Sequence, residues 1–129
     1  MNARRASRIE RKRAAERFGR FAEFLAATAL RLRGYRIVHR RFRSPQGEID
    51  IVALRGTVLA IVEVKARAER DSAAWSLSRG QRLRIERAAQ ALVARDPALA
   101  AFAVRFDLVL VGRWRWPEHV EDAWRPGMA

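Results

Sequence analysis

The chain has 129 residues, half of them hydrophobic, which fits one domain with a single core. Its 27 basic residues outnumber its 14 acidic ones, and the net charge of +13 predicts a polyanionic partner, either nucleic acid or an acidic membrane surface. The absence of cysteine excludes disulfides, thiol nucleophiles and zinc–thiolate sites, and it is consistent with a cytoplasmic location. No apolar stretch approaches the roughly 20 residues needed to span a bilayer, and the basic N-terminus lacks the apolar region of a secretory signal.

The N-terminal part of the chain divides into two segments of different composition. Residues 1–17 are dense in charge and poor in large apolar groups, so we expect a basic segment that is frayed or loosely helical. From Phe18 onward, apolar residues recur at helical spacing as far as Leu32, and Gly34 is a typical helix stop. Residues 18–129 are therefore predicted to form the single domain, which begins with this helix.

Three strands are predicted next, at residues 35–43, 48–55 and 58–67. The short turns "SPQG" and "GT" join them, which predicts a three-stranded antiparallel meander. The third strand is apolar on both faces over residues 58–62, so we expect it to be central in the sheet, with cover on both sides.

The second half of the chain predicts one more helix and at least one more strand. Residues 68–79 are polar and irregular, which indicates a surface loop, and residues 79–96 have the period of a helix. The apolar face of that helix consists of Leu83, Ile85, Ala88, Ala89, Leu92 and Val93. Residues 102–112 form a fourth strand, and the Trp-rich end supplies a fifth strand or an edge. This order predicts an α/β fold, a mixed sheet flanked by helices.

Four charged side chains lie in the apolar second and third strands, where burial is costly. Because side chains alternate along a strand, Glu63 and Lys65 share one face of the third strand. Glu48 and Asp50 likewise share one face of the second strand, and the isoleucines on either side of Asp50 are expected on the other face. Counting outward from the "GT" turn places position 63 opposite position 50. Asp50 and Glu63 are therefore predicted to lie side by side, with Lys65 next to them.

This cluster is either a salt-bridge network at the end of the sheet or a metal site. One lysine does not balance three carboxylates, and charges that emerge from a central strand pay a desolvation cost unless a further charge compensates. The two histidines are far apart in sequence, so the available ligands are carboxylate oxygens, which suit Mg²⁺ or Mn²⁺. Such an ion polarises a phosphoryl oxygen, and a neighbouring lysine stabilises transition-state charge. A basic chain with this device is predicted to hydrolyse a phosphodiester.

The same residues resemble the PD-(D/E)XK nuclease superfamily, with Asp50 as the first acid and Glu63-Val64-Lys65 as the second motif. "GEIDIVA" and "VEVKAR", with "RIERAA", "RFDLVLV" and "VEDAW", resemble the bacterial YraN family of predicted endonucleases over roughly residues 19–124. This resemblance implies a restriction-endonuclease-like fold, a DNA substrate, Mg²⁺ or Mn²⁺, and a cytoplasmic location in a bacterium. The YraN family resembles archaeal Holliday-junction resolvases, which makes branched DNA a candidate substrate by analogy and leaves a homodimer open.

The resemblance also implies roles for individual residues. An acid on the preceding helix often joins the site in this superfamily, and Glu23 matches it, so the implied metal ligands are Asp50, Glu63 and Glu23. Lys65 would position the attacking water for an in-line attack that leaves a 5′-phosphate. Gln81 stands where the family often has lysine, and it either contacts a phosphate or the water or caps its helix. The chain departs from the family pattern at Ala22, Arg41, Ile49 and Gln81.

Other charged residues have two interpretations each. Glu48 either supports the metal site or flanks the turn. Arg67 and Arg105 lie near strand ends, where each either grips a phosphate or pairs with a nearby acid. Asp107 sits within an apolar strand, and we expect it to hold an arginine rather than a metal.

The tryptophans near the C-terminus, Trp114, Trp116 and Trp124, also have two interpretations. They either stack on unpaired bases or complete the core or a dimer contact.

Together these observations predict a metal-dependent endodeoxyribonuclease in which Glu23, Asp50, Glu63 and Lys65 are catalytic. The alternative is a non-catalytic nucleic-acid-binding adaptor that keeps the nuclease fold. A third hypothesis is a basic peripheral membrane protein that uses residues 4–20 as an amphipathic helix. We expect nucleic acid, and DNA in particular, as the partner, and no stable membrane association.

Overall fold

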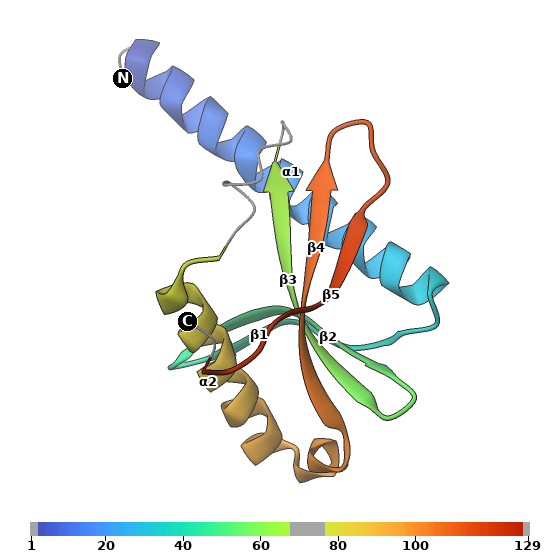
Figure 1. Cartoon of the computed structure of the whole chain (residues 1–129). Helices are drawn as coiled ribbons and strands as arrows, with labels where there is room; N and C mark the ends of the chain where they lie inside the picture. The colour runs from blue at the N-terminus through green and yellow to red at the C-terminus, as the bar shows by residue number, and fades with distance from the viewer. Residues whose placement is uncertain (1–2, 68–76, 128–129) are drawn as a thin grey trace.

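The computed structural model describes residues 3–67 and 77–127, in which two long helices enclose a five-stranded sheet (Figure 1). The elements in chain order are α1 (Ala3–Leu32), β1 (Arg36–Ser44), β2 (Gly47–Arg55), β3 (Val58–Arg67), α2 (Arg79–Arg95), a short 3₁₀ helix (Pro97–Ala101), β4 (Ala103–Gly112) and β5 (Glu118–Trp124). The predicted order of helices and strands is confirmed, and the Trp-rich end does supply a fifth strand.

The sheet is mixed, with the strand order β1-β2-β3-β4-β5. β1, β2 and β3 form the predicted antiparallel meander, and β3 is the central strand, as its apolar character requires. β4 pairs with β3 in parallel, after the chain has crossed over through α2, and β5 returns antiparallel to β4. This α/β architecture is consistent with the restriction-endonuclease-like fold that the resemblance implies.

Two hydrophobic cores lie on opposite faces of the sheet, one beneath each helix. The core beneath α2 contains Phe42, Ile49, Val52, Leu54, Leu59, Ile61, Ile85, Ala88, Ala89, Leu92, Leu99, Phe106 and Trp124. The core beneath α1 contains Ala22, Ala26, Ala27, Leu30, Tyr35, Ile51, Ala53, Ala60, Val62, Val109 and Val111. The short alanines of α1 let that helix lie close to the sheet, whereas longer side chains fill the space beneath α2.

Helix α1 begins well before the apolar pattern at Phe18, because its first half is rich in alanine, arginine and glutamate, which are good helix formers. The buried residues of the helix all lie from Ala22 onward, and the first half extends beyond the sheet (Figure 1). The helix ends as predicted at Gly34, whose φ of 91° suits a left-handed cap. The N–H of Tyr35 donates to the carbonyl of Leu30 at 3.0 Å and closes the last turn.

Helix α2 begins with a capping box, in which Ser78 Oγ accepts from the N–H of Gln81 and Gln81 Oε1 accepts from the N–H of Ser78. Of its predicted apolar face, Ile85, Ala88, Ala89 and Leu92 are buried and Val93 is partly buried, whereas Leu83 is 37% exposed, so the inclusion of Leu83 in that face is wrong. The predicted surface loop at residues 68–79 lies mostly outside the described residues.

Strand β2 does not alternate regularly, which corrects one expectation. Ile49 belongs to the core beneath α2 and Ile51 to the core beneath α1, so the two isoleucines face opposite sides of the sheet. The pairing of β2 with β3 reaches Ile51 and Val62. Across the other edge of β2, Arg41 of β1 stands opposite Asp50 in the register and has a φ of 58°. A left-handed residue in a strand twists the backbone locally, and the pleat changes face at Asp50.

Gly47 begins β2 at a point where the strand passes close to the backbone of α2. A Cβ at this position would lie 2.7 Å from the carbonyl oxygen of Arg84, which is closer than a side chain can approach. Ser44 holds the preceding turn, because its hydroxyl donates to the carbonyl of Gly47 at 2.9 Å. Gly47 therefore serves helix–strand packing as well as the turn predicted from the sequence.

Candidate active site

Asp50 and Glu63 meet at the end of the β2–β3 pair. Extending the observed register by one step from Ile51 and Val62 places these two acids opposite each other, as predicted. Their carboxyl groups lie close enough for each to shift the pKa of the other, and Asp50 Oδ2 accepts a hydrogen bond from the N–H of Val64 at 2.8 Å. The carboxyl group of Asp50 therefore points toward β3 and accepts a hydrogen bond from the backbone of that strand.

The two acids share a site that disfavours negative charge. Burial raises the pKa of Glu63, and the neighbouring Asp50 raises it further, to about 8, against a smaller lowering by Lys65. Burial likewise raises the pKa of Asp50, and its hydrogen bonds from Val64 and with Glu63 oppose this only in part. With a pKa of about 8, Glu63 therefore retains its proton near neutral pH.

Glu23 of α1 lies close enough to raise the pKa of Asp50, so the structure brings the helix acid to the same end of the sheet. Its side chain is only 13% exposed, and it forms an ion pair with Arg41. Arg41 Nη2 lies 2.7 Å from Glu23 Oε2, and Arg41 Nε donates to the same oxygen at 2.8 Å. This hydrogen bond raises the pKa of Arg41. In this arrangement Glu23 is engaged by arginine rather than facing Asp50 as a third open ligand.

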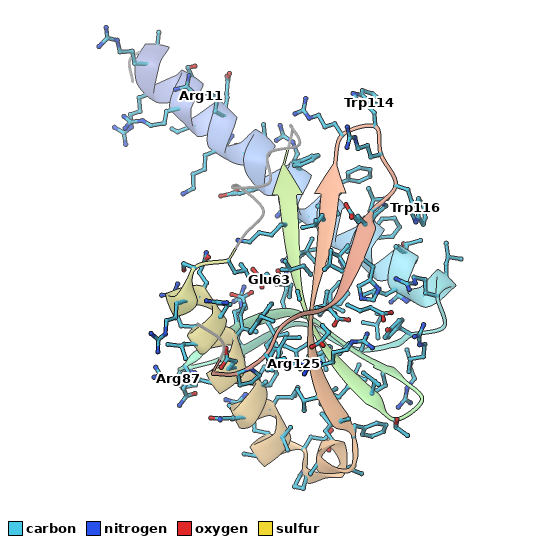
Figure 2. The ribbon with its side chains drawn as sticks, in the orientation of Figure 1. Arg11, Glu63, Arg87, Trp114, Trp116 and Arg125 are labelled. Atoms are coloured by element: carbon cyan, nitrogen blue, oxygen red, sulfur yellow. The ribbon has the colours of Figure 1, made fainter. Side chains whose placement is uncertain are left out.

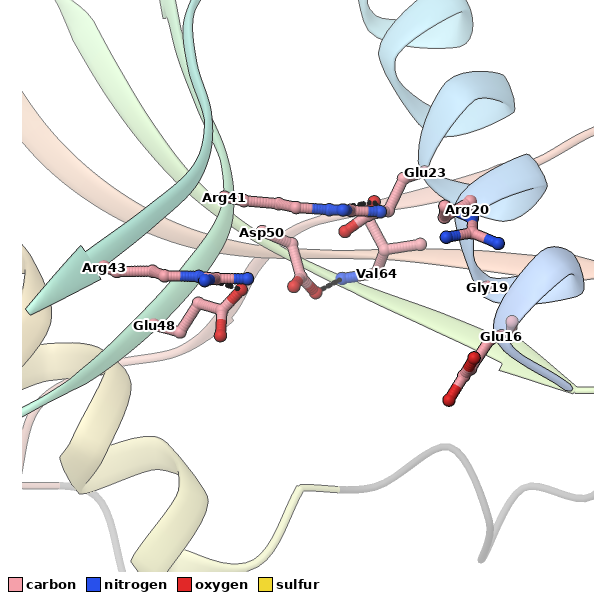
Figure 3. Close-up of a pocket in the computed structure, with 10 residues that line it drawn as sticks. Glu16, Gly19, Arg20, Glu23, Arg41, Arg43, Glu48, Asp50 and Val64 are labelled. Atoms are coloured by element: carbon pink, nitrogen blue, oxygen red, sulfur yellow. Dashed lines mark hydrogen bonds and ion pairs between the residues drawn. The ribbon is translucent and has the colours of Figure 1, made fainter. Parts of the chain in front are cut away.

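An open pocket of about 350 Å³ lies between α1 and the ends of β1, β2 and β3 (Figure 3). Its lining residues are Glu16, Gly19, Arg20, Glu23, Arg41, Arg43, Glu48, Asp50, Val64 and Ala66. Glu63 and Lys65 do not line it, because they alternate with Val64 and Ala66 and come from the other face of β3. The pair of Asp50 and Glu63 therefore bridges the edge between the pocket and the α2 side of the sheet.

The pocket contains cations that the sequence analysis did not assign to a site. Arg20, Arg41 and Arg43 line it, and Arg43 lies 3.7 Å from Glu48 in an exposed ion pair. No sequence motif marks these arginines among the 27 basic residues. The positive φ of Arg41, which aims its side chain at Glu23, is visible only in the structure.

The other predicted site residues have separate outcomes. Glu48 lines the pocket and acts through charge, since it raises the pKa of both Asp50 and Glu63. Gln81 uses its backbone N–H and side-chain oxygen in the capping box of α2, which matches the second of its two interpretations. The backbone of Arg67 ends β3, and its side chain lies outside the described part of the chain.

Arg105 belongs to a different cluster, on the α1 face of β4. It binds the fully buried Asp107 through two hydrogen bonds of 2.8 and 2.7 Å, so the expectation that Asp107 holds an arginine is confirmed. His119 and the N–H of Asp122 complete the shell around this carboxylate. Burial raises the pKa of Asp107, but these hydrogen bonds outweigh burial and lower it to about 2. In the register, Arg105 pairs with Ala60, well away from the acid pair.

The acid pair suits a divalent metal by the chemistry of its donors. Within residues 3–67 and 77–127, no group of three or more Asp, Glu or His side chains is arranged to hold a metal ion. Two carboxyl groups in contact, with raised pKa values and one lysine nearby, still form a hard-oxygen donor set with excess negative charge. Asp50 and Glu63 therefore fit a Mg²⁺ or Mn²⁺ ion, whereas Glu23 would first have to leave Arg41.

A row of cations extends from the pocket along the first half of α1. Eighteen residues span about five helical turns, so Arg4, Arg8, Arg11 and Lys12 lie on the same side of α1 as the buried Ala22, Ala26, Ala29 and Leu30. We call these four cations the basic stripe. All four are exposed, and Arg11 marks their place in Figure 2. Among the described helices, none combines the length and apolar character of a membrane span.

The tryptophans divide between the two predicted roles. Trp124 is 3% exposed, stacks on Phe106, and donates to Glu86 Oε2 at 3.2 Å, so it completes the core. Trp114 is fully exposed and Trp116 is 63% exposed at the connection between β4 and β5 (Figure 2). Only the latter two are accessible to a partner.

Comparison with known proteins places the chain in a family. The model of the uncharacterised protein family UPF0102 matches residues 22–111, which include Glu23, Asp50, Glu63 and Lys65. The chain is 55% identical to the UPF0102 protein of Parvibaculum lavamentivorans over 113 residues, which cover 88% of this chain and 85% of the relative. It is 54% identical to a UPF0102 protein of Paramagnetospirillum magneticum over 116 residues, which cover 87% of this chain and 90% of the relative. The chain therefore belongs to the UPF0102 family, as its YraN-like motifs suggested.

Proposed function

We propose that this protein is a metal-dependent nuclease that hydrolyses phosphodiester bonds of DNA. The observation that carries this proposal is the contact between Asp50 and Glu63, in which the pKa of Glu63 is raised to about 8. Acids with strongly raised pKa values, placed together at an accessible edge, are typical of sites that bind a cation or move a proton. The resemblance to the PD-(D/E)XK superfamily supports the same assignment.

Asp50 and Glu63 would hold the divalent ion, which when bound supplies Lewis-acid polarisation of a phosphoryl oxygen and a water of lowered pKa. Lys65 shares the face of Glu63 and is close enough to lower the pKa of Glu63. We assign Lys65 to the stabilisation of charge that develops on the phosphate, and to the orientation of the attacking water.

The arginines of the pocket suit the rest of a nucleic-acid backbone. Arg20, Arg41 and Arg43 line the pocket beside Asp50, and guanidinium groups bind phosphate oxygens through paired hydrogen bonds. The basic stripe continues this positive surface along α1. Residues 4–20, the segment of the membrane hypothesis, contain only two large apolar side chains, Ile9 and Phe18. These two lie nine positions apart, on opposite sides of a helix, so the segment lacks the apolar face that a membrane-surface helix needs.

The test is cleavage of labelled single-stranded, duplex, flap and four-way-junction DNA with Mg²⁺, Mn²⁺ or EDTA. Asp50→Asn keeps an oxygen for the N–H of Val64 but removes the charge, and Lys65→Met keeps the length of the side chain. Glu118→Gln, at an exposed acid of β5, is the matched control. We expect metal-dependent cutting by the wild type and the control and at least a hundredfold slower cutting by the other two variants. Equal cutting by all four proteins would refute the assignment.

A non-catalytic DNA-binding adaptor is the second candidate function. The ion pair between Glu23 and Arg41 favours it, because this pair occupies the acid that the superfamily would use as a further ligand. The adaptor predicts DNA binding in EDTA that Asp50→Asn does not weaken, and no cutting with either metal. The same DNA panel therefore separates the two functions.

A further inference from the structure

An aromatic groove lies on the flank of α1 opposite the candidate active site. It has a volume of about 570 Å³, and its lining residues are Phe18, Phe21, Leu25, Gly112, Arg113, Trp114, Arg115 and Trp116. Three of its aromatic side chains are widely exposed, with exposed fractions of 55% for Phe21, 63% for Trp116 and 100% for Trp114. We call this surface the aromatic groove.

The backbone holds these aromatic rings outward. Trp114 has a φ of 63°, a left-handed conformation that costs a bulky residue about 1–3 kcal/mol. Arg113 stacks over the ring of Phe18 at 5.5 Å and ties the connection between β4 and β5 to α1. Because Trp114 is fully exposed, no burial within this chain offsets the cost of its backbone conformation. We therefore expect its side chain to be buried in a complex with a partner.

The charge of the groove indicates which occupant it suits. Arg113 and Arg115 alternate with the two tryptophans, and none of the described residues that line the groove is acidic. A two-fold contact with a second copy would bring two such surfaces together, with four arginines and no carboxylate among them. The arginines and aromatic rings of the groove are instead complementary to a polyanion with flat apolar faces. A nucleic-acid strand with unstacked bases has both properties.

The position of the groove connects it to the acid pair. Phe18 and Phe21 line the groove, whereas Gly19 and Arg20 of the same helical turn line the pocket of the candidate site. Gly112 at the base of the groove pairs with Arg67 at the end of β3, just beyond Lys65. The two surfaces are therefore neighbours across one helix.

We propose that the aromatic groove binds unpaired bases of a DNA strand, with Trp114 and Trp116 as stacking platforms and Arg113 and Arg115 as phosphate contacts. This inference rests on the proposed nucleic-acid function and specifies its substrate as DNA with a single-stranded segment beside a duplex. Bases within a duplex are already stacked on their neighbours, so the groove should add nothing to duplex binding.

The test is fluorescence-anisotropy binding of a labelled mixed-sequence single-stranded oligonucleotide and of its duplex, in EDTA so that neither is cut. The variant Trp114→Ala/Trp116→Ala changes two exposed side chains, and Phe24→Ala removes an aromatic ring that is 53% exposed outside the groove. We expect the double variant to bind the single strand at least fivefold more weakly, which is the lower end of the cost of losing one stacked base. Duplex affinity should change by less than twofold, and Phe24→Ala should match the wild type.

Three results would overturn the inference. The first is unchanged single-strand affinity in the double variant, and the second is an equal loss on the single strand and the duplex. The third is a wild-type dimer, measured by light scattering, that the double variant converts to a monomer, since the groove would then be a contact between copies. Binding in EDTA does not depend on Asp50 or Lys65, so failure of the nuclease proposal would appear as absent cutting with this binding intact.

Discussion

The pair of Asp50 and Glu63 predicts an unusual dependence of stability on pH. The folded chain holds the proton of Glu63 up to a pKa of about 8, whereas the unfolded chain releases it near 4.5. Between these values the folded state binds more protons than the unfolded state, so the free energy of unfolding falls as the pH rises. The stabilisation is complete below pH 4.5 and is lost as the pH passes through about 8.

The change in the free energy of unfolding follows from the pKa shift of Glu63. A change in pKa from 4.5 to about 8 corresponds to about 5 kcal/mol. The side chain of Glu63 is partly exposed, and solvent screening reduces the effect to about 2–3 kcal/mol. Glu63→Gln removes the titration while keeping the shape of a protonated glutamate. We expect the variant to match the wild type at pH 5 and to be about 2–3 kcal/mol more stable at pH 8.5.

The assay is urea unfolding in EDTA at half-unit steps from pH 5 to 8.5. Glu118→Gln is the matched control, because Glu118 is an exposed acid of β5 and does not contribute to the raised pKa of Asp50 or of Glu63, so its profile should parallel that of the wild type. Parallel profiles for wild type and Glu63→Gln would refute the reasoning about the buried pair. If the pair also holds a metal, Mg²⁺ at pH 8 should stabilise the wild type more than Glu63→Gln.

Three further predictions test other parts of the molecule. Asp107→Asn should lower the free energy of unfolding by about 3–5 kcal/mol at pH 7, because it removes the fully buried carboxylate that Arg105, His119 and the N–H of Asp122 bind. Urea unfolding measures this, and a loss under about 1 kcal/mol would contradict it. Gly47→Ala should cost about 1–3 kcal/mol through its clash with α2, whereas Gly80→Ala, in open space on that helix, should stabilise by about 0.5–1 kcal/mol in the same assay. Replacing the four cations of the basic stripe by alanine should reduce, by about 2–4, the slope of log affinity for duplex DNA against log salt concentration. Alanines at Arg13 and Arg17, on the opposite flank of α1, are the control and should reduce this slope by less than about 2. Equal slopes for the wild type and the stripe variant would exclude the stripe from the interface.

Local patterns were sufficient to predict most of the fold. The period of the apolar residues located both helices, and the short turns located the meander, since each signal acts within a few residues. The apolar run of β3 indicated that it is central, because a strand with two apolar faces needs cover on both sides of the sheet. The juxtaposition of Asp50 and Glu63 followed from the same register.

The parts that sequence reasoning missed depend on contacts between distant segments. The change of face at Asp50 lies opposite the left-handed residue Arg41 of the neighbouring strand, and alternation within β2 does not predict it. The ion pair between Arg41 and Glu23 joins residues 18 positions apart, so composition could not select this arginine from the others. The length of α1 was underestimated because its first half is helical by propensity, with no buried face to mark it.

The order in which the sheet assembles has a consequence for the acid pair. β2 and β3 form a local hairpin, which folds within microseconds, whereas β4 joins β3 only after the crossover through α2, at pairs such as Val58 with Ala103. Asp50 and Glu63 thus remain hydrated through the early steps, and their charges are desolvated only when the sheet is complete and covered. We therefore expect the folding transition state to lack the electrostatic strain of the pair. At pH 8.5, where Glu63 of the wild type is ionised, Glu63→Gln should slow unfolding and leave the folding rate almost unchanged. The candidate site thus speeds unfolding at high pH without slowing folding.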